Sequence, residues 1–299
     1  MSYQSKAEEY MKIFGSTLLV ALSVSLSGCL SWDEGWKGIK DTAPKGDVSG
    51  LIAQANRQIA DADSKEKLAD LISTYEQVLE IEPANYEALW SLGRYYLLMG
   101  IAYSDSVKIK KEYYIKAIHV CERGMYTNSV FKKLVDGGAP VWDASSVLTI
   151  REIESIYYWY ASLGAYYSEC MNPVEKILNL SIGKKNKKMI ASMMAINPTW
   201  GGGHPYVAWA AYYAVAPSIV GGDLKKAADY FNKADEVGAG WLYVKFQRAK
   251  LLHTKTGDRD AFRKDLEWVL AQDPHKALSP YPWNVYFQRE AKKMLDQHI

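Results

Sequence analysis

Few side chains in this 299-residue sequence are placed to do chemistry, and His204 is the first of them. It could be a metal ligand, an acid–base group or a hydrogen-bonded packing residue. No second His or Cys lies nearby at metal-ligand spacing, so we favour the packing role and expect no metal. Asp223 follows Gly221 and Gly222 and precedes a helical pattern. We therefore interpret Asp223 as a helix N-cap rather than a ligand.

No catalytic signature accompanies these residues. The sequence has no HExxH, GxSxG or CxxC motif and no dinucleotide fingerprint. Glu152 and Glu154 lie two apart on a predicted helix, so their carboxylates diverge and cannot flank one bond. The lysine-rich run 183–188 lacks the pattern of a phosphate loop, and we interpret it as a solvated helix start. Contact with acidic lipid or an acidic partner is the alternative for this run. We expect no enzymatic activity and no cofactor.

Composition excludes several classes of protein. The chain has 36 basic and 34 acidic side chains, so its net charge of +2 gives no reason to expect nucleic acid as a partner. Three cysteines are too few for a disulfide-built miniprotein. The 22 Tyr and 10 Trp residues combine an apolar body with a polar tip, which suits both helix packing and binding surfaces.

The first residues are typical of a targeting segment. Lys12 precedes an uncharged apolar stretch, 13–26, that has the length of a signal-peptide core. Leu-Ser-Gly then precedes Cys29, which resembles the lipobox of bacterial lipoproteins. We predict a signal peptide over 1–28 and acyl chains on Cys29, with a buried cysteine after a chance apolar run as the alternative. Met11 is a more natural start than Met1. Leu30 after the cysteine, by resemblance to enterobacterial lipoproteins, favours the outer membrane.

Residues 29–49 are predicted to tether the membrane anchor to one helical domain, 50–299. Trp32 and Trp36 in this tether either rest at the lipid interface or pack on the domain. The remaining cysteines, Cys121 and Cys170, could form a disulfide in the envelope, but we favour two separate buried thiols.

The apolar spacing from Leu51 onward is helical, and no strict alternation indicates a strand. Proline and glycine pairs break the pattern into separate segments. We predict helices near 51–62, 66–82, 85–101, 106–124, 147–170, 184–196, 204–216, 223–236, 240–256, 259–272 and 283–297.

Internal repeats define the fold class. The same pattern occurs in 89–96 and 160–167: a large residue, then Leu-Gly, then Tyr, at identical spacing. The glycine of each motif would let a partner helix approach closely. Three helices are predicted to end alike, before Pro83, Pro198 and Pro274. These features favour an all-α, degenerate tetratricopeptide-like helical repeat array (an α-α superhelix) over a generic bundle. Such an array has a concave face that can hold a ligand or a peptide.

The most distinctive block runs from residue 197 to 234. It contains Pro-Thr-Trp-Gly-Gly-Gly-His-Pro-Tyr at 198–206 and then Pro217, followed by the Gly-Gly-Asp at 221–223. Gly202 and its neighbours allow a tight reversal, and Pro205 suits a first helical turn. This block resembles the T components of tripartite ATP-independent periplasmic (TRAP) transporters, called TatT. The resemblance covers about residues 50–275 and the lipobox.

Aromatic side chains in this block are candidates for binding a ligand or partner. They are Trp200, His204, Tyr206, Trp209 and Tyr213. Three of them, at 206, 209 and 213, fall on one helical stripe that could be core or could line a cavity.

The resemblance implies a lipid-anchored accessory protein that faces the periplasm and assists solute uptake. It implies docking of the periplasmic solute-binding protein, binding of a small organic ligand, and assembly into a trimer enclosing a pore. Two other hypotheses are a tetratricopeptide scaffold for envelope assembly and a helical cell-wall enzyme. A buried carboxylate in an open groove, with polar groups facing it, would favour the enzyme.

Overall fold

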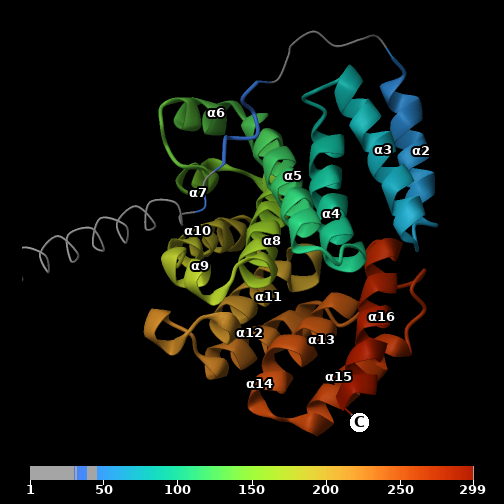
Figure 1. Ribbon diagram of the computed structural model, residues 1–299, viewed down its shortest axis with the longest axis vertical. Coiled ribbons are helices and arrows are strands. Elements are labelled where there is room, and N and C mark those ends of the chain that lie inside the picture. Colours follow the sequence, from blue (N-terminus) through green and yellow to red (C-terminus); the bar gives the residue numbers. More distant parts are fainter. Residues whose placement is uncertain (1–29, 31, 39–45, 299) are drawn as a thin grey trace, which may run out of the picture.

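The structure is a computed structural model that describes residues 30, 32–38 and 46–298. The predicted signal peptide and Cys29 lie outside these residues. The described part of the chain is helical and contains no strand, which confirms the all-α repeat array (Figure 1).

The helices occur in two successive groups along the chain. The first comprises α2 (Val48–Ile59), α3 (Lys65–Ile81), α4 (Tyr86–Tyr103), α5 (Val107–Tyr126), α6 (Ser129–Asp136), α7 (Val141–Ala144), α8 (Ile153–Cys170), α9 (Pro173–Leu178) and α10 (Ser181–Ile196). The second comprises α11 (Trp200–Val215), α12 (Leu224–Val237), α13 (Leu242–Arg248), α14 (Thr254–Thr256), α15 (Arg259–Leu270) and α16 (Tyr281–His298).

The predicted helix ends are confirmed where proline stops a helix. α3 ends at Ile81 before Pro83, and α10 ends at Ile196 before Pro198. The prediction of one helix over 147–170 is wrong at its start, because short 3₁₀ turns occupy 145–147 and 150–152 before α8. The short helices α6, α7 and α9 were not predicted, because four to eight residues give too few turns for a periodic pattern.

The two repeat motifs differ in how tightly they pack. A Cβ atom on Gly93 would lie 2.4 Å from the sulfur of Cys121, so the glycine allows α4 and α5 to approach closely, as predicted. At Gly164 the nearest atom would be 3.9 Å away, on the Asn186 side chain. The predicted close approach at Gly164 is therefore wrong, because α10 passes α8 at a greater distance there.

The C-terminal helix returns to the N-terminal half of the array. Arg289 of α16 donates a hydrogen bond to the carbonyl of Ala102 at the end of α4, at 2.8 Å. Tyr286 and Phe287 are buried in the same apolar cluster as residues of α2 to α4. In Figure 1, α16 accordingly lies beside the end of α2 and α3, so the superhelix closes on itself.

The N-terminal strap, which we define as Leu30 with residues 32–38, packs on the body. Trp36 stacks on Tyr126 with ring centroids 4.9 Å apart, and Trp32 donates a hydrogen bond to Glu122 at 3.1 Å. Both tryptophans therefore pack on the domain, which decides between the two alternatives. Cys121 and Cys170 are buried, separate thiols, as predicted.

Candidate functional site

A solvent-open groove with a cavity of about 780 Å³ lies between α12, α13 and α15. Its walls carry four cationic side chains, three carboxylates, His253 and Trp268. The lining residues are Leu224, Lys225, Ala228, Asn232, Asp235, Lys245, Arg248, Leu252, His253, Thr256, Asp258, Ala261, Lys264, Asp265 and Trp268. A cavity of this size suits a small organic molecule.

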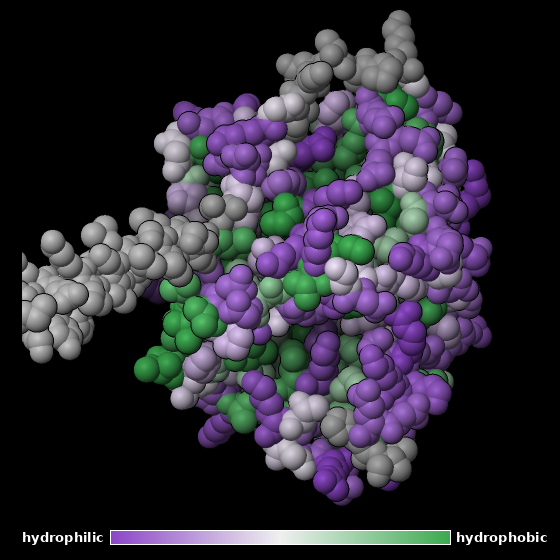
Figure 2. Space-filling model, in the orientation of Figure 1, coloured by the Kyte–Doolittle hydropathy of each residue, from purple (hydrophilic) through white to green (hydrophobic). Residues whose placement is uncertain are grey.

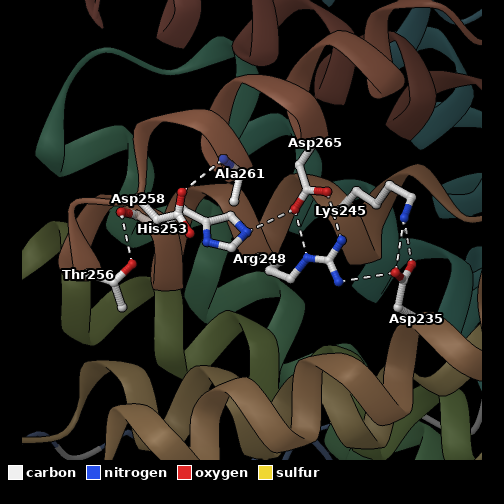
Figure 3. Close-up of polar contacts among 8 residues, drawn as sticks. All are labelled: Asp235, Lys245, Arg248, His253, Thr256, Asp258, Ala261 and Asp265. Atoms are coloured by element: carbon white, nitrogen blue, oxygen red, sulfur yellow. Dashed lines mark hydrogen bonds and ion pairs between the residues drawn. The ribbon is translucent and has the colours of Figure 1, made fainter.

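The wall of the groove is a connected network of ion pairs (Figure 3). Arg248 donates two hydrogen bonds of 2.7 Å to the two oxygens of Asp265. It also donates one of 3.1 Å to Asp235, which accepts a further bond of 2.8 Å from Lys245. The paired geometry at Asp265 is the strong, bidentate form of an arginine–carboxylate interaction.

A π-helical turn, Ala249–His253, sets the register of this network. Arg248 and His253 are five residues apart, which on an α-helix would turn their side chains about 140° away from each other. Both nevertheless reach Asp265, with His253 Nε2 at 3.2 Å from the carboxylate. The wider π turn places both on one side, and such turns frequently occur at functional sites.

The network holds its charges in place. Burial by itself would raise the pKa of Asp265, but hydrogen bonds from Arg248 and His253 outweigh burial and leave that pKa below its ordinary value. The hydrogen bonds to Asp265 in turn raise the pKa of Arg248. Asp265 therefore remains a carboxylate at neutral pH and cannot serve as a general acid there.

Asp265 is the buried carboxylate in an open groove that the enzyme hypothesis requires. However, both of its oxygens are bound, by Arg248 and His253. In the part of the chain that the structure describes, no hydroxyl or thiol group forms a hydrogen bond with the His253 ring. The groove thus has charged binding groups but no nucleophile paired with a base.

The structure places Trp200 and His204 in a second region, which we call the His204 shell. The His204 ring stacks on Tyr243 with centroids 4.5 Å apart and contacts Tyr157 at 4.9 Å and Trp241 at 5.2 Å. Its Nδ1 forms a hydrogen bond with the Gly201 carbonyl.

Burial lowers the pKa of His204 to about 3, against the opposing effect of the bond to the Gly201 carbonyl. His204 is thus a neutral, hydrogen-bonded packing residue at physiological pH. No group of three His, Cys, Asp or Glu side chains within the described ranges is placed to hold a metal ion.

The other three aromatic candidates form a separate, half-exposed row, which we call the aromatic stripe. Tyr206, Trp209 and Tyr213 of α11 are joined by Tyr230 of α12. Tyr213 and Tyr230 are stacked with centroids 5.7 Å apart, and Trp209 and Tyr213 with centroids 5.6 Å apart. The structure therefore divides the five candidates between the His204 shell and the stripe rather than bringing them to one site.

Backbone geometry explains the glycines and prolines of this block. Residues 201–203 all have positive φ, and a Cβ on Gly202 would lie 2.2 Å from Trp241, so only glycine fits. Pro205 follows directly in the first regular turn of α11.

The second half of the block reverses the chain between α11 and α12. The carbonyl of Pro217 accepts a bond from the Gly222 amide, after Gly221 at a φ of +100°. The Asp223 side chain caps α12 by accepting from the amides of Lys225 and Lys226 at 3.0 and 3.1 Å.

Sequence reasoning missed the groove itself. Lys245 and Arg248 are three residues apart on one helix face, which was its only local signal. Their acidic partners come from α12 and α15, and no spacing rule connects these helices.

Together, the curved helix array and the open, charged groove define a helical-repeat protein with a solvent-open groove. A family model described as TRAP transporter T-component matches residues 64–298. The chain therefore belongs to the TRAP transporter T-component family, and is an accessory component of such a transporter system in the cell envelope. Comparison with curated proteins finds no match.

Among the residues that the structure describes, no helix combines the length and the apolar character needed to cross a bilayer.

Proposed function

We propose that this protein is a lipid-anchored accessory subunit on the periplasmic side of the outer membrane that binds a small organic ligand in the groove. The observation that carries the proposal is the 780 Å³ cavity with its fixed Arg248–Asp265 pair. Lys225 of α12 and Lys264 of α15 both line the groove and are exposed, so they can bind polar groups of a ligand. The protein binds its ligand without breaking bonds.

The aromatic stripe is proposed to dock the periplasmic solute-binding protein. Tyrosine and tryptophan rings offer large apolar faces with polar tips, which are enriched at protein interfaces. Lys226 and Lys233 lie over the rings of Tyr213 and Tyr230 at 5.5 and 5.1 Å. Helix α12 contributes to both the stripe and the groove, so ligand and partner would meet at one helix. A homotrimer remains a proposal from the family resemblance.

Native mass spectrometry tests the ligand part of the proposal. The protein purified from membranes should carry a small molecule that denaturation releases. The variant Lys225→Glu/Lys264→Glu should reduce its occupancy about tenfold, since each reversal replaces a hydrogen-bond donor for the ligand with a carboxylate that cannot donate. Tyr213→Ser/Tyr230→Ser is the matched control and should keep the ligand. If the native protein purified from membranes releases no small molecule on denaturation, the groove is not a binding site.

Crosslinking in membrane extracts tests the partner part. The stripe variant should lose the crosslink to the solute-binding protein, whereas the groove variant should keep it. If both variants crosslink like the native chain, the stripe is not the docking surface. If the captured partners are instead outer-membrane assembly proteins, the scaffold hypothesis replaces transport.

A further inference from the structure

An apolar face protrudes from the body at α9 and at the connection between α11 and α12. Val174, Ile177 and Ile219 are 65 %, 68 % and 92 % exposed, and Leu178, Leu180 and Val220 are exposed beside them in the chain. Figure 2 shows hydrophobic surface gathered at the left edge, over α9 and this connection. A contiguous exposed apolar surface marks a site of interaction.

The polar side chains of α9 are turned away from this face. Glu175 accepts a hydrogen bond from the Asn172 amide at 2.7 Å, closing the capping box of α9. Lys176 donates to the carbonyl of Ser168 at 2.9 Å. Glu175 is thus engaged by the backbone at the start of α9 and Lys176 by the backbone of α8, while the apolar side chains of α9 point outward.

The start of α10 joins the two parts of the apolar face. Lys187 of α10 lies over the Tyr212 ring at 5.3 Å, and the Tyr212 hydroxyl donates to the Val220 carbonyl at 2.8 Å. Lys184 and Lys187 are exposed about one and two turns after Leu180. The apolar face is therefore bordered by lysines, the pattern of segments that lie at the surface of an anionic bilayer.

The N-terminal strap brings the chain to the same place. The Leu30 amide donates a 2.7 Å hydrogen bond to the side chain of Asn179, the residue that follows α9. Further along the strap, the Gly35 amide donates to Glu122 at 2.8 Å, and Trp32 donates to the same carboxylate. The strap is thus held to the body by hydrogen bonds at Leu30, Trp32 and Gly35.

Acyl chains on Cys29 would enter the bilayer beside α9, because the sequence joins Cys29 directly to Leu30. This step rests on the lipid anchor of the proposed function. Because Leu30 is hydrogen-bonded to Asn179 beside α9, the anchor would bring this face of the body toward the membrane.

We propose that the apolar face of α9 and the α11–α12 connection lies in the headgroup region of the phospholipid bilayer, with Lys184 and Lys187 against anionic headgroups. This second contact fixes the orientation of the body on the membrane. The groove, formed by α12, α13 and α15, is then held at a set position relative to the membrane surface.

The test uses the mature chain from residue 29 with Cys29→Ser, so that no acyl chain is present. All residues of the three apolar core clusters lie at or after Leu30, so this chain contains the complete described core. It should bind vesicles of phosphatidylethanolamine and phosphatidylglycerol in sedimentation. Val174→Asn/Ile177→Asn should weaken vesicle binding at least tenfold, because two apolar side chains that would insert into the bilayer are replaced by polar ones.

The control is Leu278→Asn, which alters a residue of similar exposure (61 %) between α15 and α16, on the other side of the molecule (Figure 1). It should bind as the parent does. Lys184→Gln and Lys187→Gln should each weaken binding about fivefold on anionic vesicles and leave binding to neutral phosphatidylcholine unchanged.

Site-directed spin labelling gives a second readout. Cys121 and Cys170 are buried, so an added surface cysteine is the reactive thiol of the Cys29→Ser chain. A nitroxide at Ile177→Cys should gain access to oxygen and lose access to an aqueous relaxant when vesicles are added, and one at Leu278→Cys should not.

Three results would overturn the proposal: a parent chain that does not bind vesicles, a Val174→Asn/Ile177→Asn variant that binds normally, or a label at 177 that stays aqueous. A loss of self-association or of crosslinking to the solute-binding protein, with vesicle binding intact, would make this face a protein interface instead. The anchor is tested separately, by release of the full-length Cys29→Ser chain from the membrane fraction. Failure of the anchor and failure of the apolar face therefore give different results.

Discussion

The groove and the His204 shell stabilise buried polar groups differently: the groove keeps them charged and paired, and the shell keeps one neutral. In the groove, Arg248 and Asp265 keep their charges and satisfy them with paired hydrogen bonds. In the His204 shell, burial keeps the imidazole neutral, and one hydrogen bond to a backbone carbonyl suffices. The two regions adjoin, because α13 carries both Arg248 and Tyr243.

The groove can respond to salt and to a ligand, whereas the His204 shell is rigidly packed. Charged groups at a solvent-open groove can exchange partners with a ligand, and their energies depend on salt and on occupancy. The neutral His204 ring is held on several sides by other rings, and it offers a ligand no free polar atom at Nδ1. The groove is therefore the proposed ligand site, whereas the His204 shell packs α11 against α13.

Removing the arginine from the groove should have the largest effect on stability. Arg248→Met leaves the Asp265 carboxylate, whose side chain is 5 % exposed, without its main partner. We expect the free energy of unfolding to fall by about 3–5 kcal/mol, as for a buried ion pair that loses one member. Urea denaturation measures it, with Lys225→Met, an exposed cation of the same groove, as the control. A loss below about 1 kcal/mol would mean that the network is not a structural unit.

Acid should distinguish the His204 shell from the groove. The folded pKa of His204 is about 3, and the unfolded value is about 6.5. Between these values the unfolded chain binds a proton that the folded chain does not, so stability falls as the pH falls. By pH 5 the loss should reach about 2 kcal/mol relative to pH 7, and His204→Phe should abolish this part of it.

The loss of unfolding free energy between pH 7 and pH 5 is measured in both the native chain and His204→Phe, and the difference between the two chains is the contribution of His204. Burial raises the pKa of Glu122 to about 7 in the folded state, against hydrogen bonds from Trp159, Gly35 and Trp32. Protonation of Glu122 therefore favours the folded state between about pH 4.5 and 7, opposite in sign to His204. Both chains retain Glu122, so its contribution cancels. Equal pH dependence in the two chains would show that His204 does not titrate as described.

The aromatic stripe should show the smallest effect. A double-mutant cycle of Tyr213→Leu and Tyr230→Leu should give a coupling energy of about 0.5–1.5 kcal/mol, the usual value for a stacked pair. Because stacking involves no net charge, 1 M salt should leave this coupling unchanged. The same salt should weaken the coupling between Lys245 and Asp235, which are partly exposed. If 1 M salt weakens the coupling between Tyr213 and Tyr230, the lysines Lys226 and Lys233 rather than ring stacking account for most of the coupling energy.

Interactions within a few residues of each other could be predicted from the sequence. Helix positions, the ends before Pro83 and Pro198, the cap at Asp223 and the reversal at Gly202 all depend on backbone preferences that act over about one turn. The motif at 197–234 likewise indicated the family that the match over 64–298 shows.

Only the tertiary structure decided which distant side chains meet. Asp235, Arg248 and Asp265 come from three helices, and a π turn brings His253 to the same side as Arg248. The strap on Glu122, the tight fit at Gly93 and the looser one at Gly164 also depend on how far one helix lies from another. Sequence periodicity records which face of a helix is apolar, but it contains no term for the distance or angle to the next helix. The groove arises from those distances and angles, which is why it could not be predicted.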